Sequence, residues 1–124
     1  EVPHLSDALR RLNTPTSLLI RCDKMLYSCG VPPMDALTGE IIKGGMKEQT
    51  HAVMNVIKIA LESAGSNLNN IIKATIYITD PNLMGEVNEV YRDYFPGVPP
   101  VRSFVAVKPW PLPFDIEIDV VAYV

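Results

Sequence analysis

Arg102 and Glu117 are the side chains in this sequence whose types and positions best suit catalysis. They fall in two stretches near the C-terminus, 101–107 and 114–120, that we predict to be strands of an otherwise apolar sheet. A guanidinium presents a planar fork of donors that can hold a carboxylate at two points. A carboxylate beside it can ready a water molecule and carry protons. Together the two residues predict a site where water attacks a small carboxylate substrate.

The same two residues could instead form a structural ion pair, and their spacing alone leaves this alternative open. Other catalytic chemistry finds less support in the sequence. His4 lies in an irregular N-terminus and His51 on a polar helix face, so neither is expected to bind a metal or to serve a nucleophile. Gly44 and Gly45 lack the lysine and the spacing of a phosphate loop. No metal and no organic cofactor is therefore expected.

The composition is that of an ordinary globular domain. Of the 124 residues, 48% are hydrophobic and 20% are charged, so we expect a single domain spanning residues 1–124. The net charge of −3 gives no basic footprint for nucleic acid, and no apolar run approaches the ~20 residues that cross a membrane. The first residues also lack the basic start and apolar core of a signal peptide.

Cys22 and Cys29 are the two cysteines of the chain. In a hairpin of strands 18–22 and 25–29 that turns at residues 23–24, they stand at opposite ends, too far apart for a disulfide. Two free thiols indicate the reducing cytoplasm. We therefore expect a soluble cytoplasmic protein with neither nucleic acid nor membrane among its partners.

Two helices and a further strand lie between this hairpin and the C-terminal strands. Apolar residues at helical spacing predict a helix over 46–64, which Gly65 ends as a left-handed cap. Asp80-Pro81 predicts the start of a second helix, which continues to about Phe95. Between the helices, residues 71–79 are rich in β-branched side chains and predict a strand.

The resulting order is β-β-α-β-α-β-β, which predicts an α+β fold with two helices on one face of a mixed sheet. Two helices can cover only one face. In the last strand Ile116, Ile118 and Val120 point one way, while Val121 and Tyr123 are apolar on the reverse side. The uncovered face is therefore expected to meet another subunit, in a homo-oligomer with a sheet-lined interface.

Several segments carry a resemblance to a known family. The C-terminal signature is Pro100-Val101-Arg102-Ser103-Phe104-Val105, followed at the right distance by Ile116-Glu117-Ile118. The upstream segments are Thr38-Gly39-Glu40-Ile41, Glu48-Gln49-Thr50, Ala64-Gly65-Ser66 and Val87-Asn88-Glu89-Val90-Tyr91. Taken in this order, they resemble the RidA (YjgF/YER057c/UK114) family over nearly the whole chain.

The resemblance implies a chorismate-mutase-like fold and a homotrimer with active sites in the clefts between subunits. It also implies hydrolysis of reactive 2-imino and 2-enamino acids to the keto acid and ammonia, without a metal or an organic cofactor. By the resemblance, Arg102 holds the substrate carboxylate, Glu117 positions the attacking water, and Asn88 lines the pocket. The signature therefore favours the catalytic interpretation of Arg102 and Glu117 over the ion pair.

The sequence departs from the family pattern around the expected pocket. Thr16 stands where the family has a tyrosine, so an aromatic pocket wall is lost. The family's Ser-Gly-Gln aligns as Cys29, Gly30 and a valine, although a shift of one residue would place Ser28 there instead. We expect Thr16, Ser28, Cys29 and Gly30 to shape the substrate site together with Asn88. The changes fit a longer or more apolar acid, for example an aminomuconate-type enamine.

Three alternatives stay open. The chain could be a non-catalytic carboxylate-binding or regulatory trimer that keeps Arg102 and makes no use of Glu117. It could act on RNA, as is sometimes ascribed to relatives, although the acidic balance argues against this. Cys29 could be a covalent nucleophile, although no histidine is positioned to activate it. Trp110 is expected to pack against the protein or lie at an interface rather than to stack on a substrate.

Overall fold

The structure is a computed structural model that describes residues 6–9 and 15–124. Its main elements are β1 (Leu19–Cys22), β2 (Met25–Ser28), α2 (Met46–Ser63), β3 (Ile71–Ile78), α3 (Met84–Asp93), β4 (Val101–Ala106) and β5 (Ile116–Tyr123). Short 3₁₀ turns at Leu68–Asn70 and Pro81–Leu83 precede β3 and α3. Residues 6–9, which were expected to be irregular, form one helical turn, and His4 lies outside the described residues.

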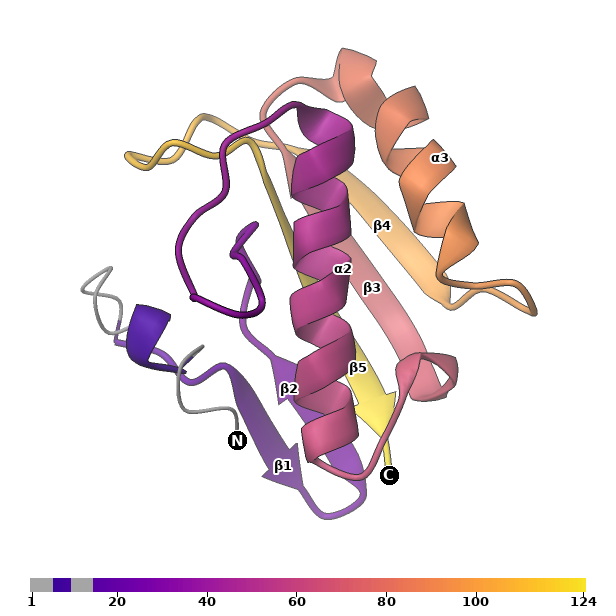
Figure 1. Cartoon of the computed structure of the whole chain (residues 1–124). Coiled ribbons are helices and arrows are strands. Elements are labelled where there is room, and N and C mark those ends of the chain that lie inside the picture. Colours follow the sequence, from indigo (N-terminus) through magenta and orange to yellow (C-terminus); the bar gives the residue numbers. More distant parts are fainter. Residues whose placement is uncertain (1–5, 10–14) are drawn as a thin grey trace.

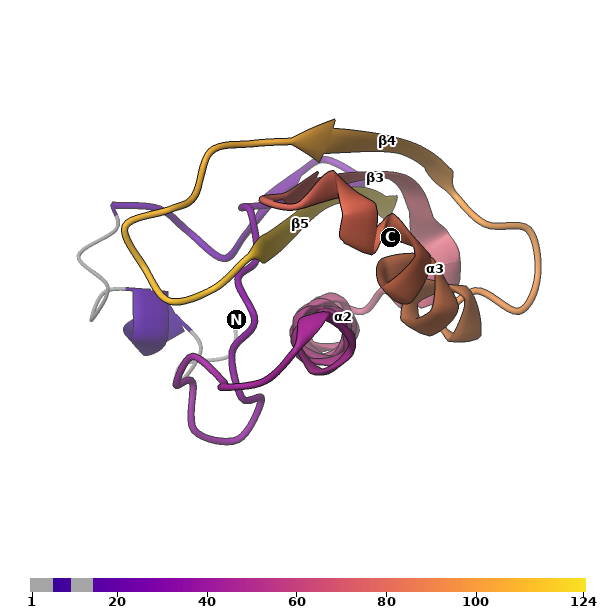
Figure 2. The ribbon, with the colours of Figure 1, turned by 90° about the horizontal axis from the view of Figure 1, so that it is seen from above.

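The strands form one five-stranded mixed sheet in the order β1-β2-β5-β3-β4. β4 runs parallel to β3, and the other neighbouring strands are antiparallel. Figure 1 shows α2 and α3 in front of the sheet, and Figure 2 shows both helices on the same side of it. The predicted element order and the α+β fold with two helices on one face are confirmed.

The N-terminal hairpin has the predicted register. Cys22 pairs with Met25, and the Cys29 N–H donates to the Leu18 carbonyl over 3.1 Å. Asp23 takes the left-handed turn position, at φ 56°. Both cysteines are free thiols.

α2 begins at Met46, as predicted, whereas α3 begins at Met84, three residues after Pro81. Gly65 follows α2 at φ 82°, in the left-handed conformation that favours glycine. The Asp80 side chain accepts from the Asn82 N–H over 3.0 Å, but the first turn that it caps is a 3₁₀ turn. α3 ends at Asp93 rather than at Phe95, because the chain tightens into i→i+3 bonds ahead of Pro96, which has no N–H to continue the ladder.

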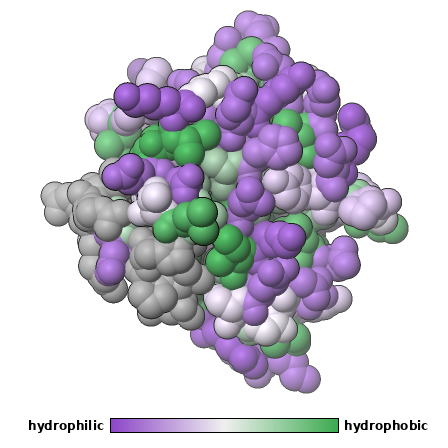
Figure 3. Space-filling view, in the orientation of Figure 1, coloured by the Kyte–Doolittle hydropathy of each residue, from purple (hydrophilic) through white to green (hydrophobic). Residues whose placement is uncertain are grey.

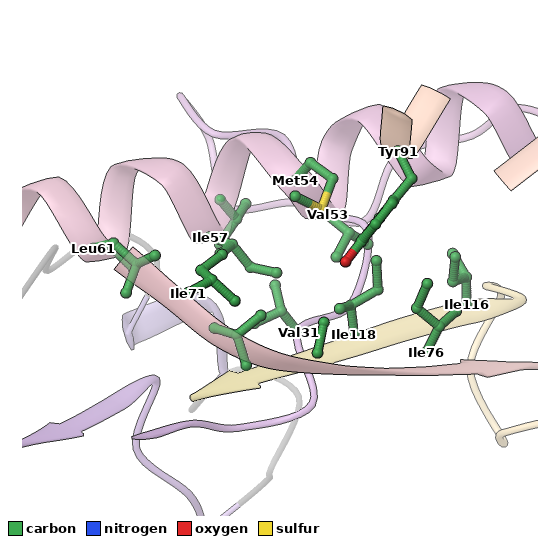
Figure 4. Close-up of a cluster of buried hydrophobic side chains, with 14 of the residues drawn as sticks. Val31, Val53, Met54, Ile57, Leu61, Ile71, Ile76, Tyr91, Ile116 and Ile118 are labelled. Carbon is green, nitrogen blue, oxygen red and sulfur yellow. The ribbon is translucent and has the colours of Figure 1, made fainter. Parts of the chain in front are cut away.

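The hydrophobic core lies between the helices and the sheet. Figure 4 shows Val53 and Ile57 of α2 above Ile76 and Ile118 of the sheet, and all four side chains are at most 1% exposed. Tyr91 reaches into the same cluster from α3. The outer surface of the helix layer is mainly hydrophilic (Figure 3), and no helix of the described residues is long and apolar enough to span a membrane.

Candidate active site

Arg102 lies on the helix-facing side of β4. Its Cα pairs with that of Ala74 in β3, and the Ala74 side chain is buried under the helices. The guanidinium reaches α3, where Nη1 donates to Oδ1 of Asn88 over 2.8 Å. It also lies over two rings, with Cζ 5.2 Å from the ring centroid of Tyr91 and 5.6 Å from that of Phe104. An amide oxygen and two rings thus hold the guanidinium in place without neutralising its charge.

A pocket of about 370 Å³ opens beside Arg102 and Asn88. Its other lining residues are Tyr91, Arg92, Phe95, Pro99 and Pro100. The volume is at the lower end of the roughly 300–1,000 Å³ typical of small-molecule sites. Among the described residues, no carboxylate forms an ion pair with Arg102. This arginine pocket, as we call the seven residues, therefore presents positive charge beside apolar walls and suits a small organic anion.

Glu117 lies on the opposite face of the sheet. Its Cα pairs with that of Tyr77 in β3, while the adjacent Ile116 and Ile118 are buried under the helices. The side chain is half-buried, and its carboxyl group forms no hydrogen bond or ion pair with any described residue. Burial raises the pKa of this carboxyl to about 7, and the negative charge of Asp119 adds to the rise. Glu117 can therefore both bind and release a proton near neutral pH.

Gly30 lies directly against this carboxyl group. A Cβ at position 30 would overlap Oε1 of Glu117, so only glycine leaves the carboxyl group in its present place. A β-bulge brings Gly30 there. Tyr27 of β2 pairs with Val121, and the next pair is Val31 with Ile118, so residues 28–30 oppose only residues 119–120.

Ser28 and Cys29 occupy the same bulge with different roles. The Ser28 hydroxyl accepts from the Val120 N–H over 2.9 Å and donates to the Cys29 carbonyl over 2.8 Å, so it is engaged by the backbone. The Cys29 thiol is partly buried, and burial followed by the charge of Glu117 raises its pKa to about 11. Such a thiol stays protonated near neutral pH, which argues against Cys29 as a covalent nucleophile. Glu117, Gly30 and Cys29 form what we call the glutamate cluster.

Two further expectations concern Thr16 and Trp110. Thr16 is exposed, and its hydroxyl donates to the Ser17 carbonyl over 3.3 Å. No described contact joins it to the arginine pocket or to the glutamate cluster, so its part in the site stays a prediction. Trp110 packs on Phe114, with ring centroids 5.0 Å apart, as expected for a packing residue.

Arg102 and Glu117 do not adjoin within one chain. Their strands lie on either side of β3, and their side chains point to opposite faces of the sheet. A structural ion pair between them is therefore excluded in a single chain. The expectation that the Arg102 guanidinium lies beside the Glu117 carboxylate is likewise wrong within one chain. What one chain offers is two half-sites, the arginine pocket on the helix side and the glutamate cluster on the other side.

Groups that could hold a metal do not come together in the described part of the chain. No three His, Cys, Asp or Glu side chains are close enough there to share an ion. His51 is exposed on α2, as expected, and its Nδ1 lies 3.0 Å from the Tyr94 hydroxyl.

Sequence reasoning found Arg102 and Asn88 but missed the rest of the arginine pocket. The spacing of the pocket residues on α3 and just after it could have indicated them. They recur at intervals of three or four and share one helix face: Asn88, Tyr91, Arg92 and Phe95. Pro99 and Pro100 come from the irregular connection before β4, where no periodicity indicates their position. Asp119 could also have been found, since it follows Glu117 by two residues on the same strand and faces the same way.

The sequence matches the protein family described as Endoribonuclease L-PSP over residues 9–124. The chain belongs to this family. A solved structure from Yersinia pestis, described as a member of the conserved Rid protein family, is similar to it with a TM-score of 0.84 and 37% identity, over 89% of this chain and 88% of that one. The resemblance to RidA proteins is thereby confirmed, and so is the Rid fold.

Two curated relatives of this Rid-family chain add to the comparison. A RutC family protein of Pyrococcus horikoshii is 43% identical over 109 residues, which cover 88% of this chain and 86% of that protein. The 2-iminobutanoate/2-iminopropanoate deaminase of Mus musculus is 32% identical over 108 residues, which cover 87% of this chain and 80% of the mouse protein. Imine deaminase activity therefore occurs within the family.

Proposed function

We propose that this Rid-family chain hydrolyses 2-imino and 2-enamino acids to the 2-keto acid and ammonia. The observation that carries the proposal is the Glu117 carboxyl group, which is half-buried, has no described partner, and has a pKa of about 7. Arg102 supplies an uncompensated guanidinium for the substrate carboxylate. The name of the mouse relative supports the same class of reaction.

The reaction requires positioning and proton transfer. Ionised Glu117 accepts a proton from water while the water oxygen bonds to the carbon of the iminium group. The carboxyl group then gives this proton to the amine nitrogen, and the C–N bond breaks as ammonia leaves. The hydroxyl proton finally passes to ammonia, so that an iminium ion and water become a ketone and ammonium. An enamine enters the same sequence after its β-carbon takes up a proton from the solvent, which converts it to the iminium ion.

Each of the three residues has its own part in the proposed reaction. General acid–base catalysis by one placed carboxyl group accelerates a reaction by about 10²–10⁴-fold. Arg102 holds the substrate by its carboxylate, which contributes through orientation rather than through chemistry. Asn88 fixes the guanidinium by its 2.8 Å hydrogen bond, and we propose that it thereby keeps the donors aimed into the pocket.

The proposal requires a second copy of the chain. Since Arg102 and Glu117 face opposite sides of the sheet, the arginine pocket of one copy must meet the glutamate cluster of another. The face that carries Glu117 is suited to such a contact, because it also carries exposed apolar side chains from four strands. These are Ile20, Tyr27, Val101, Val105 and Tyr123. A contact between two different surfaces forms a ring when the rotation between copies closes, and the homotrimer implied by the RidA resemblance is such a ring.

The direct test measures ammonia released from freshly generated 2-imino acids. We expect Arg102→Ala and Glu117→Gln each to lower kcat/KM by at least about 10²-fold. Lys58→Gln is the control, because Lys58 is exposed on the outer face of α2. Parental rates in both site variants would refute the assignment. Binding of carboxylates by the parent without any turnover would instead support a regulatory protein.

RNA cleavage is the second candidate function, and the description of the matched family favours it. The net charge of −3 opposes it, because RNA binding generally depends on a basic surface. Incubation with a labelled single-stranded RNA distinguishes the two functions. Any cleavage should be measured in Arg102→Ala and Glu117→Gln as well as in the parental protein.

A further inference from the structure

A second guanidinium lines the arginine pocket. Arg92 lies on α3 one residue after Tyr91 and four residues after Asn88, so it shares a helix face with the residue that holds Arg102. Its side chain is exposed, whereas Arg102 is fixed by Asn88 and two rings. The pocket therefore has one positioned cation and one with room to move.

The charges around the pocket are not balanced. Both charged residues of the lining are arginines, and the rest of the lining is one amide, two aromatic rings and two prolines. Among the described residues, neither arginine forms an ion pair with a carboxylate. Glu89, which precedes Arg92 by three residues on α3, pairs with Lys47 over 3.0 Å. Two like charges beside one apolar pocket repel each other, and an anion bound between them would offset this repulsion.

We propose that Arg92 binds a second anionic group of the substrate, at the end remote from the imine. The substrates are then 2-imino or 2-enamino dicarboxylates, with one carboxylate on Arg102, the other on Arg92, and the carbon chain against Tyr91, Phe95 and the prolines. This inference rests on the proposed deaminase function and names its substrate class. Arg92 is a specificity residue, since it would act on the end of the substrate that does not react.

Arg92 also has a structural role that a test must separate from binding. It lies in the last turn of α3, where a positive charge interacts favourably with the carbonyl end of the helix. Loss of that interaction changes stability without regard to the substrate. A preference between two matched substrates, measured in the same variant, is not affected by such a loss.

The experiment compares 2-iminoglutarate with 2-iminopentanoate, each generated in the assay by an amino-acid oxidase from glutamate or norvaline. The two share a five-carbon chain and differ in the distal carboxylate. For the parental protein we expect kcat/KM to favour 2-iminoglutarate. Arg92→Gln should lower kcat/KM for 2-iminoglutarate by about tenfold and leave 2-iminopentanoate nearly unchanged, in line with the loss of one charged hydrogen bond. Arg92→Lys should keep most of the preference, and Lys58→Gln should keep all of it.

A binding measurement separates this inference from the proposed function. Glutarate and pentanoate are stable analogues. At equal concentration, the one that binds more tightly should raise the melting temperature more, with the stabilisation growing as the logarithm of the ligand concentration over Kd. We expect glutarate to bind more tightly than pentanoate to the parent, and Arg92→Gln to remove the difference. If this holds while no imine is turned over, the dianion site stands and the deaminase proposal falls. If Arg92→Gln affects both ligands and both substrates equally, or neither, Arg92 is not a specificity residue and the inference is wrong.

Discussion

Glu117 is the residue whose protonation should be visible in the kinetics. Its pKa is raised to about 7, first by burial and then by the charge of Asp119. The proposed first step uses the ionised carboxylate, so kcat/KM should fall as the pH drops below about 7 and level off above it. Glu117→Gln should abolish this dependence together with most of the activity.

Asp119→Asn is the matched variant for the pH profile. It leaves the burial of Glu117 unchanged and removes the Asp119 charge that adds to the rise in the Glu117 pKa. An amide oxygen can still accept the 2.9 Å hydrogen bond from the Tyr77 hydroxyl. The falling limb of the profile should therefore move to lower pH. If Asp119→Asn is fully active and its pH profile is unchanged, a group other than Glu117 sets the pH dependence of kcat/KM.

The close approach of Gly30 to Glu117 gives a second prediction. In Gly30→Ala the new methyl group displaces the carboxyl group, because both cannot occupy the same space. A displacement of about 1 Å can cost roughly 10²-fold in rate, so we expect such a loss of kcat/KM with the fold retained. Gly85→Ala is the control, since a Cβ there meets nothing within 4 Å. Equal rates in the two alanine variants would mean that the carboxyl position does not matter.

At the scale of elements, the bulge between β2 and β5 depends on Ser28. Its hydroxyl satisfies the Val120 N–H where the ladder is interrupted. Ser28→Ala leaves that donor unpaired, so we expect the free energy of unfolding to fall by about 1–2 kcal/mol. Ser17→Ala, at an exposed position, should change it by less than about 0.5 kcal/mol.

Urea unfolding at one fixed protein concentration measures both variants, because an oligomer's midpoint depends on concentration. Ser28→Ala with the midpoint of the parent would indicate that water replaces the hydroxyl. The bulge would then not depend on the serine side chain.

The elements were largely predictable because their signals are local. The apolar face of α2, the cap at Gly65 and the turn at residues 23–24 each follow from neighbouring residues, and all three occur as predicted. The bulge at residues 28–30 was not predictable in the same way. It depends on how β2 pairs with β5, which is distant in the sequence.

The relation of Arg102 to Glu117 was only half predictable. Buried Ile116 and Ile118 place Glu117 on the reverse face by simple alternation. β4 has no such pattern, because it is an edge strand in which Phe104 is partly buried and the other five residues are exposed. The face of the sheet on which Arg102 lies follows from the register of β4 with β3 and from the contact with Asn88. Both are properties of the folded chain.

At the scale of the whole molecule, the two half-sites predict complementation between inactive variants. Arg102→Ala keeps the glutamate cluster, and Glu117→Ala keeps the arginine pocket. When the two variants are co-expressed and assemble at random, roughly a quarter of the contacts should combine two intact halves, as expected for a ring of heterologous contacts. Ammonia release should recover to a similar fraction of the parental rate.

Each variant expressed alone provides the baseline for this measurement. A co-expressed sample that is no more active than either variant would show that catalysis does not use residues from two chains. Since one chain holds Arg102 and Glu117 on opposite faces, the proposed mechanism would then have no geometry in which to operate.

The opposed placement of the two half-sites also bears on when the protein first becomes active. A newly synthesised chain carries parts of two different sites and no complete one, so it is inactive until it assembles with other copies. Turnover per chain should then climb with protein concentration and vanish on extreme dilution. Assembly itself would act as the switch.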